Sequence, residues 1–236
     1  MIKFCVFKWN PEGLDLLPSQ KIVDYAAIGA GHVNRMRNMV DRHLHVEHEF
    51  ICITDDPTGL DPGITIIPLW NDCAELGGCY RRLKFWSSDM KTLIGDRIVQ
   101  CDIDTVITGD ITHIVTRQEP VLLYKHPQHI CNGGMWVMDA GCRSDVWDNF
   151  DPETSPELSK NEIGTDQGWL KYYLRDDLLS GKIKTFGRES GVMDMRIDIL
   201  GNNGGELPAD CCMVSFAGPR DPSQYPDVGW INEHWR

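Results

Sequence analysis

The sequence lacks the patterns in which cysteine and histidine usually bind zinc. Its nine cysteines are scattered over 236 residues without a CxxC pair, and its eight histidines form no HExxH motif. The cysteine count is odd, and several cysteines lie in apolar runs such as FCVF and FICIT, where this residue acts as a small buried hydrophobe. We therefore expect reduced thiols and a cytoplasmic protein.

An excess of positive charge and a long apolar segment are also missing. The formal net charge is −12, whereas a general nucleic-acid binder uses a basic face to neutralise phosphates. The composition therefore argues against nucleic acid as a partner. No apolar run approaches the roughly 20 residues that a membrane span requires. The sequence GAGH at Gly29–His32 is not followed by GK[ST], so it is no phosphate-binding P-loop.

Short apolar runs alternate with helical patterns along the chain. This alternation favours an α/β fold with a mixed, mostly parallel sheet flanked by helices. No repeat or long linker is present, so we expect one domain over residues 1–236. Strands are predicted at Ile2–Phe7, Phe50–Thr54, Gly63–Pro68, Arg97–Cys101, Val121–Tyr124, Cys131–Asp139 and Cys212–Phe216. Helices are predicted at Val33–Leu44, Tyr80–Ile94, Arg143–Phe150 and Gly164–Leu174, a short helical or turn segment at Asp110–Thr116, and a loop at Gly201–Asp210.

Two acids end one of these predicted strands. In GDRIVQCDIDTVITGD, Asp102 and Asp104 follow the apolar run and flank Ile103. In an extended segment alternate side chains share a face, so both carboxylates point the same way with their Cα atoms about 6.5 Å apart. Without a cation, two such acids buried together would repel each other and one would be protonated. Oxygen ligands alone favour Mn²⁺ or Mg²⁺ over zinc.

The two acids alone fit more than one enzyme class. A glycosyltransferase could use them to hold a nucleotide diphosphate through a metal. A phosphatase of the haloacid-dehalogenase type is also possible, because the sequence DIDTV from Asp102 to Val106 satisfies that family's nucleophile motif. A third reading is a loop in which the acids only cap a turn. The neighbouring segments are needed to choose among them.

Four segments, in order, resemble the family 8-like, glycogenin-related glycosyltransferases of the GT-A fold, including small bacterial and phage enzymes. RRLKFW at 81–86 precedes the strand and DIDT at 102–105, with Arg82 and Trp86 at the family's basic and tryptophan positions. CNGGMWVMDAG at 131–141 is similar to an asparagine–glycine strand, and GTDQGWL at 164–170 to a helix that begins with an aspartate–glutamine pair. VSFAGPRDP at 214–222 is similar to the family's closing loop. The resemblance covers most of the chain.

The resemblance implies a GT-A nucleotide-diphospho-sugar transferase fold and a role for each matching residue. Asp166 and Gln167 would line the reacting sugar as the catalytic pair. Asp102, Asp104 and Ser215 would face the metal. The donor would be bound by Phe7, Trp9, Asp56, Arg82, Asp102, Ile103, Asp104, Asn132, Gly133, Gly134, Gly218 and Arg220.

Two positions depart from the family pattern. Ser215 stands where the family has a metal-binding histidine, and a serine hydroxyl is a weaker ligand. Asp221 stands where the family has a phosphate-binding lysine, with Arg220 beside it as a replacement source of positive charge. These departures keep open a protein that binds a nucleotide sugar without turning it over.

The function implied by the resemblance is transfer of a sugar from a nucleotide diphosphate, UDP-hexose foremost, with Mn²⁺ or Mg²⁺ as cofactor and retention of anomeric configuration. The acceptor would be a glycan, a lipid-linked sugar or a protein. The phosphatase leaves the NGG, TDQG and FAG segments unexplained. A sugar nucleotidyltransferase is weaker still, because its glycine-rich amino-terminal loop with arginine and lysine is missing.

Overall fold

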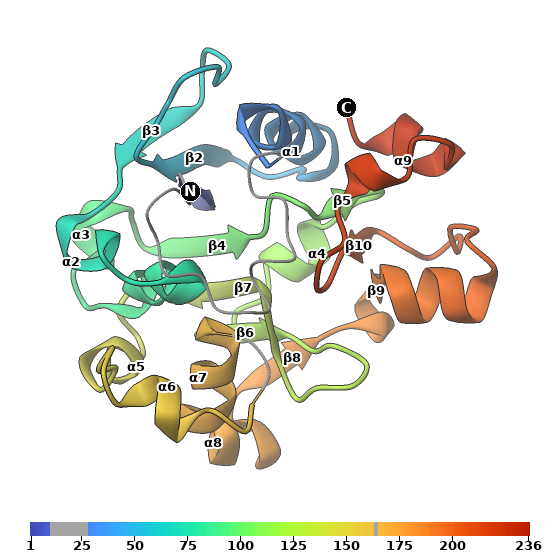
Figure 1. Cartoon of the computed structure of the whole chain (residues 1–236). Helices are drawn as coiled ribbons and strands as arrows, with labels where there is room; N and C mark the ends of the chain where they lie inside the picture. The colour runs from blue at the N-terminus through green and yellow to red at the C-terminus, as the bar shows by residue number, and fades with distance from the viewer. Residues whose placement is uncertain (10–27, 163–164) are drawn as a thin grey trace.

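The computed structural model describes residues 1–9, 28–162 and 165–236. Its large sheet has the strand order β3-β2-β1-β4-β7-β6-β8 (Figure 1). All neighbouring strands run parallel except β7, which is antiparallel to both β4 and β6. These strands are β1 (Ile2–Lys8), β2 (His48–Thr54), β3 (Thr65–Pro68), β4 (Arg97–Cys101), β6 (Val121–Tyr124), β7 (Asn132–Asp139) and β8 (Lys184–Phe186). The prediction of a mixed, mostly parallel sheet is confirmed.

The alternation of side chains along each strand divides the core between the two faces of this sheet. In β1, Phe4 and Val6 belong to one hydrophobic cluster, which also contains the buried side of helix α1 (Ala30–His43). Cys5 and Phe7 belong to the other cluster, which contains buried residues of helix α7 (Asp166–Tyr173). Both faces of the sheet are therefore covered, as the continuous apolar runs of its strands require.

Most helices of the described chain are short. The α-helices are α1 and α7, given above, with α2 (Asn71–Ala74), α3 (Met90–Leu93), α4 (Thr112–Val115), α5 (Asp145–Asp148), α6 (Ser155–Leu158), α8 (Arg175–Leu179) and α9 (Gly229–His234). Three 3-10 helices span Gly78–Trp86, Arg188–Ser190 and Pro222–Gln224, and a π-helix spans Met195–Gly201. Within the residues described, no helix has the length and apolar character needed to cross a membrane.

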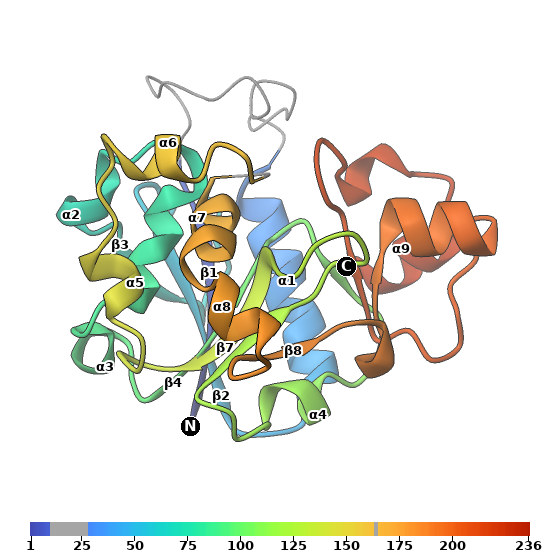
Figure 2. The ribbon, with the colours of Figure 1, turned by 90° about the horizontal axis from the view of Figure 1, so that it is seen from below.

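A small second sheet joins the carboxyl-terminal part of the chain to the segment after the two acids. Its strands are β5 (Val106–Ile107), β9 (Val192–Asp194) and β10 (Met213–Ser215), in the order β5-β10-β9. Val214 pairs with Val106. Because β5 begins two residues after Asp104, this pairing places Ser215 beside the acids. Figure 2 shows the carboxyl-terminal segment, in orange and red, to one side of the large sheet.

The single helix predicted over Tyr80–Ile94 is wrong. The chain instead forms the 3-10 helix Gly78–Trp86, ends it at Ser87 in extended conformation, and begins α3 at Met90. The Ser87 hydroxyl donates to the carbonyl oxygen of Lys84 at 2.8 Å and also bonds Asp89. Such local bonds compete with helix propagation.

Several elements near the carboxyl terminus were not predicted. Strands β8 and β9, the π-helix and α9 all come from segments without a clear period. The predicted loop 201–210 begins with the last residue of the π-helix, stays helical through residue 203, and then forms turns and irregular chain. The predicted helix at 164–174 is confirmed as α7, and its first residue, 164, lies outside the described part of the chain.

Candidate functional site

A cavity of about 610 Å³ lies at one edge of the large sheet, where several strands end. Strands β1, β4 and β6 point their carboxyl ends to this edge, and the antiparallel β7 begins there. Four side chains at or next to these strand ends line the cavity: Lys8, Asp102, His126 and Asn132. Open α/β sheets bind ligands at this position, because the loops leaving the strands diverge and leave a crevice.

The structure brings nearly all of the predicted site residues to this cavity. Asp56 does not line it: its side chain is exposed and accepts hydrogen bonds from the Thr58 backbone N–H at 2.9 Å and from Lys8 Nζ at 3.4 Å. The predicted residues that do line it are Phe7, Trp9, Arg82, Asp102, Ile103, Asp104, Asn132, Gly133, Gly134, Asp166, Gln167, Ser215, Gly218 and Arg220.

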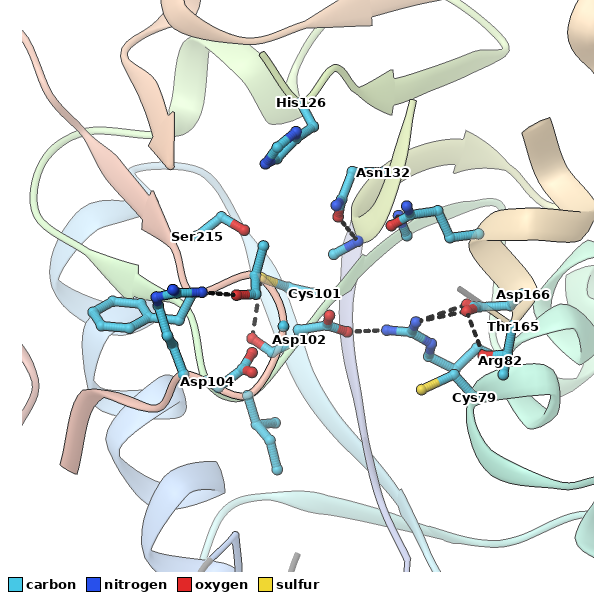
Figure 3. A pocket seen from close by; sticks show the side chains of 18 of the residues that line it. Cys79, Arg82, Cys101, Asp102, Asp104, His126, Asn132, Thr165, Asp166 and Ser215 are labelled. Carbon is cyan, nitrogen blue, oxygen red and sulfur yellow. Dashed lines mark hydrogen bonds and ion pairs between the residues drawn. The ribbon is translucent and has the colours of Figure 1, made fainter. Parts of the chain in front are cut away.

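One buried arginine connects two acids that are far apart in the sequence. Arg82, on the 3-10 helix, pairs through Nη1 with Asp102 Oδ1 and through Nη2 with Asp166, at 2.9 Å to Oδ1 and 2.7 Å to Oδ2 (Figure 3). Burial disfavours the charged guanidinium, but the two carboxylates outweigh this effect and raise the pKa of Arg82. The arginine thereby fixes Asp166, at the start of α7, relative to the end of β4.

The two acids after β4 carry different pKa shifts. Burial raises the pKa of Asp102 to about 6, although the positive charge of Arg82 opposes the shift. Burial also raises the pKa of Asp104 well above its usual range, and the negative charges of Asp102 and Asp221 add to this rise. A pair of half-buried carboxylates with raised pKa values is an environment in which a cation is strongly favoured.

The donor atoms near these acids fit a hard divalent cation. In the described part of the chain, no group of three or more His, Cys, Asp and Glu side chains could hold a metal ion. The available set is therefore the Asp102 and Asp104 carboxylates with the Ser215 hydroxyl, all oxygen donors that line one cavity. This set suits Mg²⁺ or Mn²⁺, with water or substrate oxygens completing the coordination. It would not suit zinc, which prefers nitrogen and sulfur.

The glycine pair at the start of β7 leaves space for these groups. A Cβ atom on Gly133 would lie 3.2 Å from Arg82 Nη2 and 3.3 Å from Asp166 Oδ2. A Cβ on Gly134 would lie 2.9 Å from Asn132 Oδ1, 3.6 Å from Asp102 Oδ2 and 3.8 Å from the Ser215 hydroxyl oxygen. The pairing of β7 with β6 shifts register between Asn132 and Trp136, so both glycines lie in an irregular part of the strand where polar side chains approach the backbone closely.

Gly134→Ala is expected to weaken Mn²⁺ binding by about tenfold or more, because the new methyl group enters the space between Asp102, Asn132 and Ser215. Isothermal titration calorimetry with MnCl₂ measures this directly. Gly229→Ala is the matched control, since a Cβ there meets nothing within 4 Å. Equal Mn²⁺ affinity in the Gly134→Ala protein and the wild type would contradict this placement of the cation.

The amides expected to contact a sugar are partly used within the protein. Asn132 Oδ1 accepts a hydrogen bond from the backbone N–H of Gly134 at 2.6 Å. Gln167 Oε1 accepts one from the backbone N–H of Gly133 at 3.2 Å. These bonds hold both side chains against the first residues of β7, at the wall of the cavity. In Asn132, this bond leaves the side-chain NH₂ group for a ligand.

The loop after β10 is anchored by the aspartate that stands in the lysine position. Asp221 is buried, and its Oδ2 lies 2.8 Å from His32 Nε2. Its Oδ1 accepts a hydrogen bond from the Ser223 backbone N–H at 2.8 Å, and with Gln224 it forms a capping box. Asp221 therefore holds the loop to helix α1 and does not line the cavity. Arg220 and Gly218 of the same loop do line it.

Asp221→Ala is expected to lower the free energy of unfolding by about 2 to 4 kcal/mol at pH 7, because it removes a helix cap and leaves a buried histidine nitrogen unsatisfied. Burial raises the pKa of Asp221, but hydrogen bonds from His32 and Ser223 outweigh it and hold the pKa below its usual value. The contribution of a carboxylate with a lowered pKa is present above the unfolded-state pKa of about 3.9 and is lost as the pH falls through the folded-state pKa.

Urea unfolding of both proteins at several pH values measures this difference. The stability gap between the wild type and Asp221→Ala should be largest near neutral pH and should narrow in acid below about pH 4. A gap that stays constant down to pH 2 would show that the Asp221 charge does not stabilise the loop.

Several lining residues were missed by sequence reasoning. His126, Gln128 and His129 come directly after the predicted strand Val121–Tyr124, so the strand-end rule that found Asp102 also applies to them. Arg196 lies on the unpredicted π-helix, and no sequence signal pointed to it. The other lining residues that were not predicted are Lys8, Ile28, Cys79, Gln100, Cys101, Thr165, Phe216, Ala217 and Pro219.

Comparison with known proteins gives a likeness in fold. No protein-family model and no curated protein matches this sequence. Among solved structures, the chain is similar to the galactosyltransferase LgtC in complex with donor and acceptor sugar analogues, at a TM-score of 0.58 and 14% identity, covering 98% of this chain and 94% of LgtC. An active-site mutant of LgtC is similar at a TM-score of 0.52 and 13% identity, with the same coverage. The chain therefore has the GT-A glycosyltransferase fold.

Proposed function

We propose that this protein is a metal-dependent glycosyltransferase that moves a hexose from a nucleotide diphosphate, UDP foremost, to an acceptor with retention of configuration. Residues 1–236 would act as one catalytic domain in the cytoplasm. The fold is that of LgtC, a galactosyltransferase crystallised with donor and acceptor sugar analogues. This likeness supports the reaction class, and the residues of the cavity carry the rest of the proposal.

The observation that carries the proposal is the link from Asp102 through Arg82 to Asp166. It joins the acids of the cation site to the start of α7, with the first residues of β7 between them. A nucleotide sugar needs this combination, because its diphosphate requires positive charge while its sugar requires hydrogen-bonding groups a few ångströms away. Neither a turn cap nor a lone metal site would require the buried arginine.

The cavity offers a place for each part of the donor. Trp9 at the end of β1, with Phe7 at 6.1 Å between ring centroids, would pack against the nucleobase. Asp102 and Asp104, with Ser215, would hold Mn²⁺ or Mg²⁺, which supplies positive charge to the leaving nucleoside diphosphate. Arg220 would add to this charge from the loop after β10. Ile103 and Gly218 would contact the donor through van der Waals packing.

The side chains around β7 and α7 would act on the sugar. Asp166 and the amide groups of Asn132 and Gln167 would bind its hydroxyls and orient the anomeric carbon toward the acceptor. The glycine pair lets the sugar approach the backbone closely. A donor phosphate oxygen would accept the proton of the attacking hydroxyl, so no protein nucleophile is required for retention. Analysis of the product anomer by NMR tests this point, and an inverted product would refute it.

A donor screen with MnCl₂ tests the proposal. Release of UDP from UDP-hexoses, measured with a coupled assay, should exceed release of nucleotide from other nucleotide sugars. An aryl phosphate in the same buffer tests the phosphatase, and phosphate release from it would favour that reading. Binding of UDP-hexose without any turnover, including hydrolysis, would instead indicate a non-catalytic binding protein.

A further inference from the structure

The turn after β6 and the start of the π-helix form a polar group at one end of the cavity. His126, Gln128 and His129 belong to the turn, and Arg196 belongs to the π-helix; all four line the cavity. None of them has a part in the binding of the donor described above. These four side chains would contact the acceptor, so an inference about them rests on the proposed function.

The strand order separates this group from the donor end of the cavity. Strand β6 is three places from β1 in the sheet, with β4 and β7 between them. Neighbouring strands lie about 4.8 Å apart, so the ends of β1 and β6 are about 14 Å apart. A donor with its base near Trp9, its diphosphate over β4 and its sugar at β7 would therefore leave the space beyond β6 to the acceptor. In Figure 3, His126 lies on the far side of Asn132 and Ser215 from Asp104.

His126 holds this turn in place. Its Nδ1 lies 3.2 Å from the backbone nitrogen of Gln128, which can only donate a hydrogen bond. Nδ1 is therefore the acceptor, so the proton of the neutral ring is on Nε2, which donates to Asp194 Oδ2 at 3.2 Å. Both side chains are buried. Asp194 also accepts from the backbone N–H of Ile197 and so connects the turn to the π-helix.

Arg196 brings positive charge to this end of the cavity. Arg196 Nη2 donates to Gln128 Oε1 at 2.9 Å, and among the described residues no carboxylate lies within ion-pair distance of Arg196. The ring of His129 stacks on that of His126 at 5.1 Å, and burial together with the positive charge of Lys171 lowers the His129 pKa. The acids nearby have other partners: Asp194 bonds His126, and Glu162 pairs with Arg175.

We infer that the acceptor carries an anionic group, a phosphate or a carboxylate, which Arg196 binds together with His129 and Gln128. The guanidinium of Arg196 has nitrogen donors that the single bond to Gln128 leaves unused, and their planar geometry suits two oxygens of one anion. A neutral sugar would accept hydrogen bonds from this guanidinium, whereas an anion would also gain the attraction between opposite charges. In a chain with net charge −12, a local cationic end of the cavity would select an acidic acceptor by attraction.

Binding of glucose, glucose 6-phosphate and glucuronate tests the inference. Isothermal titration calorimetry is carried out in the presence of saturating UDP and MnCl₂, so that the anions cannot occupy the diphosphate site. The two anionic sugars should bind the wild type at least tenfold more tightly than glucose. Arg196→Gln should remove this preference, Arg196→Lys should keep part of it, and Arg37→Gln on helix α1, outside the cavity, should leave it unchanged.

The outcomes separate this inference from the proposed function. Suppose that UDP with MnCl₂ binds normally. If anionic sugars then bind no better than glucose, or bind Arg196→Gln as tightly as the wild type, the anionic acceptor is refuted. The proposed glycosyltransferase function is unaffected by that result. If UDP does not bind, the titrations are repeated without it. A preference for anionic sugars that Arg196→Gln removes would then support the subsite while the proposed donor fails.

Discussion

Replacing Asp104 with asparagine is expected to lower the rate of nucleotide release by at least about 1,000-fold, because a metal site that loses one of two carboxylates binds its cation poorly. The same substitution should leave the protein at least as stable as the wild type. The pKa of Asp104 is raised by burial and by the charges of Asp102 and Asp221. The charged form therefore destabilises the fold at pH values above the unfolded-state pKa of about 3.9.

Thermal unfolding with and without MnCl₂ measures both effects. At a MnCl₂ concentration of about 100 times the dissociation constant, binding stabilises a protein by about 2.7 kcal/mol, which corresponds to a rise in Tm of roughly 5–10 °C for a chain of this size. This rise should occur in the wild type and be missing in Asp104→Asn. Without metal, the advantage of Asp104→Asn should grow from pH 4 upward.

Asp110→Asn is the matched control. Asp110 is an exposed acid six residues further along that accepts a hydrogen bond from the Thr112 backbone N–H at 2.8 Å, outside the cavity. It should keep the manganese-dependent rise in Tm and the wild-type rate. A fully active Asp104→Asn enzyme would overturn the assignment of the cation site.

Arg82→Ala should have the largest effect on stability. It leaves the buried Asp166 carboxylate and the partly exposed Asp102 carboxylate without their cation, and breaking a buried ion pair such as Arg82–Asp166 costs about 3–5 kcal/mol. Transfer should fall by at least about 100-fold, because Asp166 and Asp102 lose their common support. Urea unfolding at pH 7 gives the change in stability, and nucleotide release gives the change in rate.

A double variant distinguishes the structural role of Arg82 from its role in the reaction. Arg82→Met with Asp166→Asn removes the arginine and one of the two orphaned charges, so it should recover part of the lost stability. It should not recover activity. Arg82→Lys should keep one ion pair but lose the second, since its ammonium lacks the planar fork that reaches both acids. A stability loss below about 1 kcal/mol in Arg82→Ala would mean that the buried link is weak.

The parts of the site that the sequence predicted are those that depend on strand ends. Asp102 and Asp104 follow a clear apolar run, and the fold of the chain places that run inside the sheet. Asn132 and Asp166 were found through their motifs, and both reach the cavity because β7 begins, and α7 starts, at the edge where β4 ends. Local patterns could therefore indicate the residues, but not that Arg82 would join two of them.

The parts that the sequence could not predict depend on contacts between distant segments. The role of Asp221 requires His32, which is 189 residues earlier. The group around Arg196 requires a π-helix, and a segment of 7 residues is too short to show the period of such a helix in the sequence. The break at Ser87 depends on whether its side chain bonds the backbone or solvent, and periodicity does not resolve that choice. Asp56 follows a strand end as the other acids do, yet its exposed turn keeps it off the cavity wall.

The order of the strand ends also determines which pairs of substitutions have additive effects on binding free energy. Trp9 follows β1 and His129 follows β6, three places away in a rigid sheet. Side chains more than about 7–10 Å apart without a shared partner change binding free energies independently. Changes at the two ends of the cavity should therefore add, so nucleotide preference and acceptor preference could be redesigned separately. Arg82 is the exception, because its two ion pairs couple the end of β4 to α7 and make substitutions at Asp102 and Asp166 interdependent.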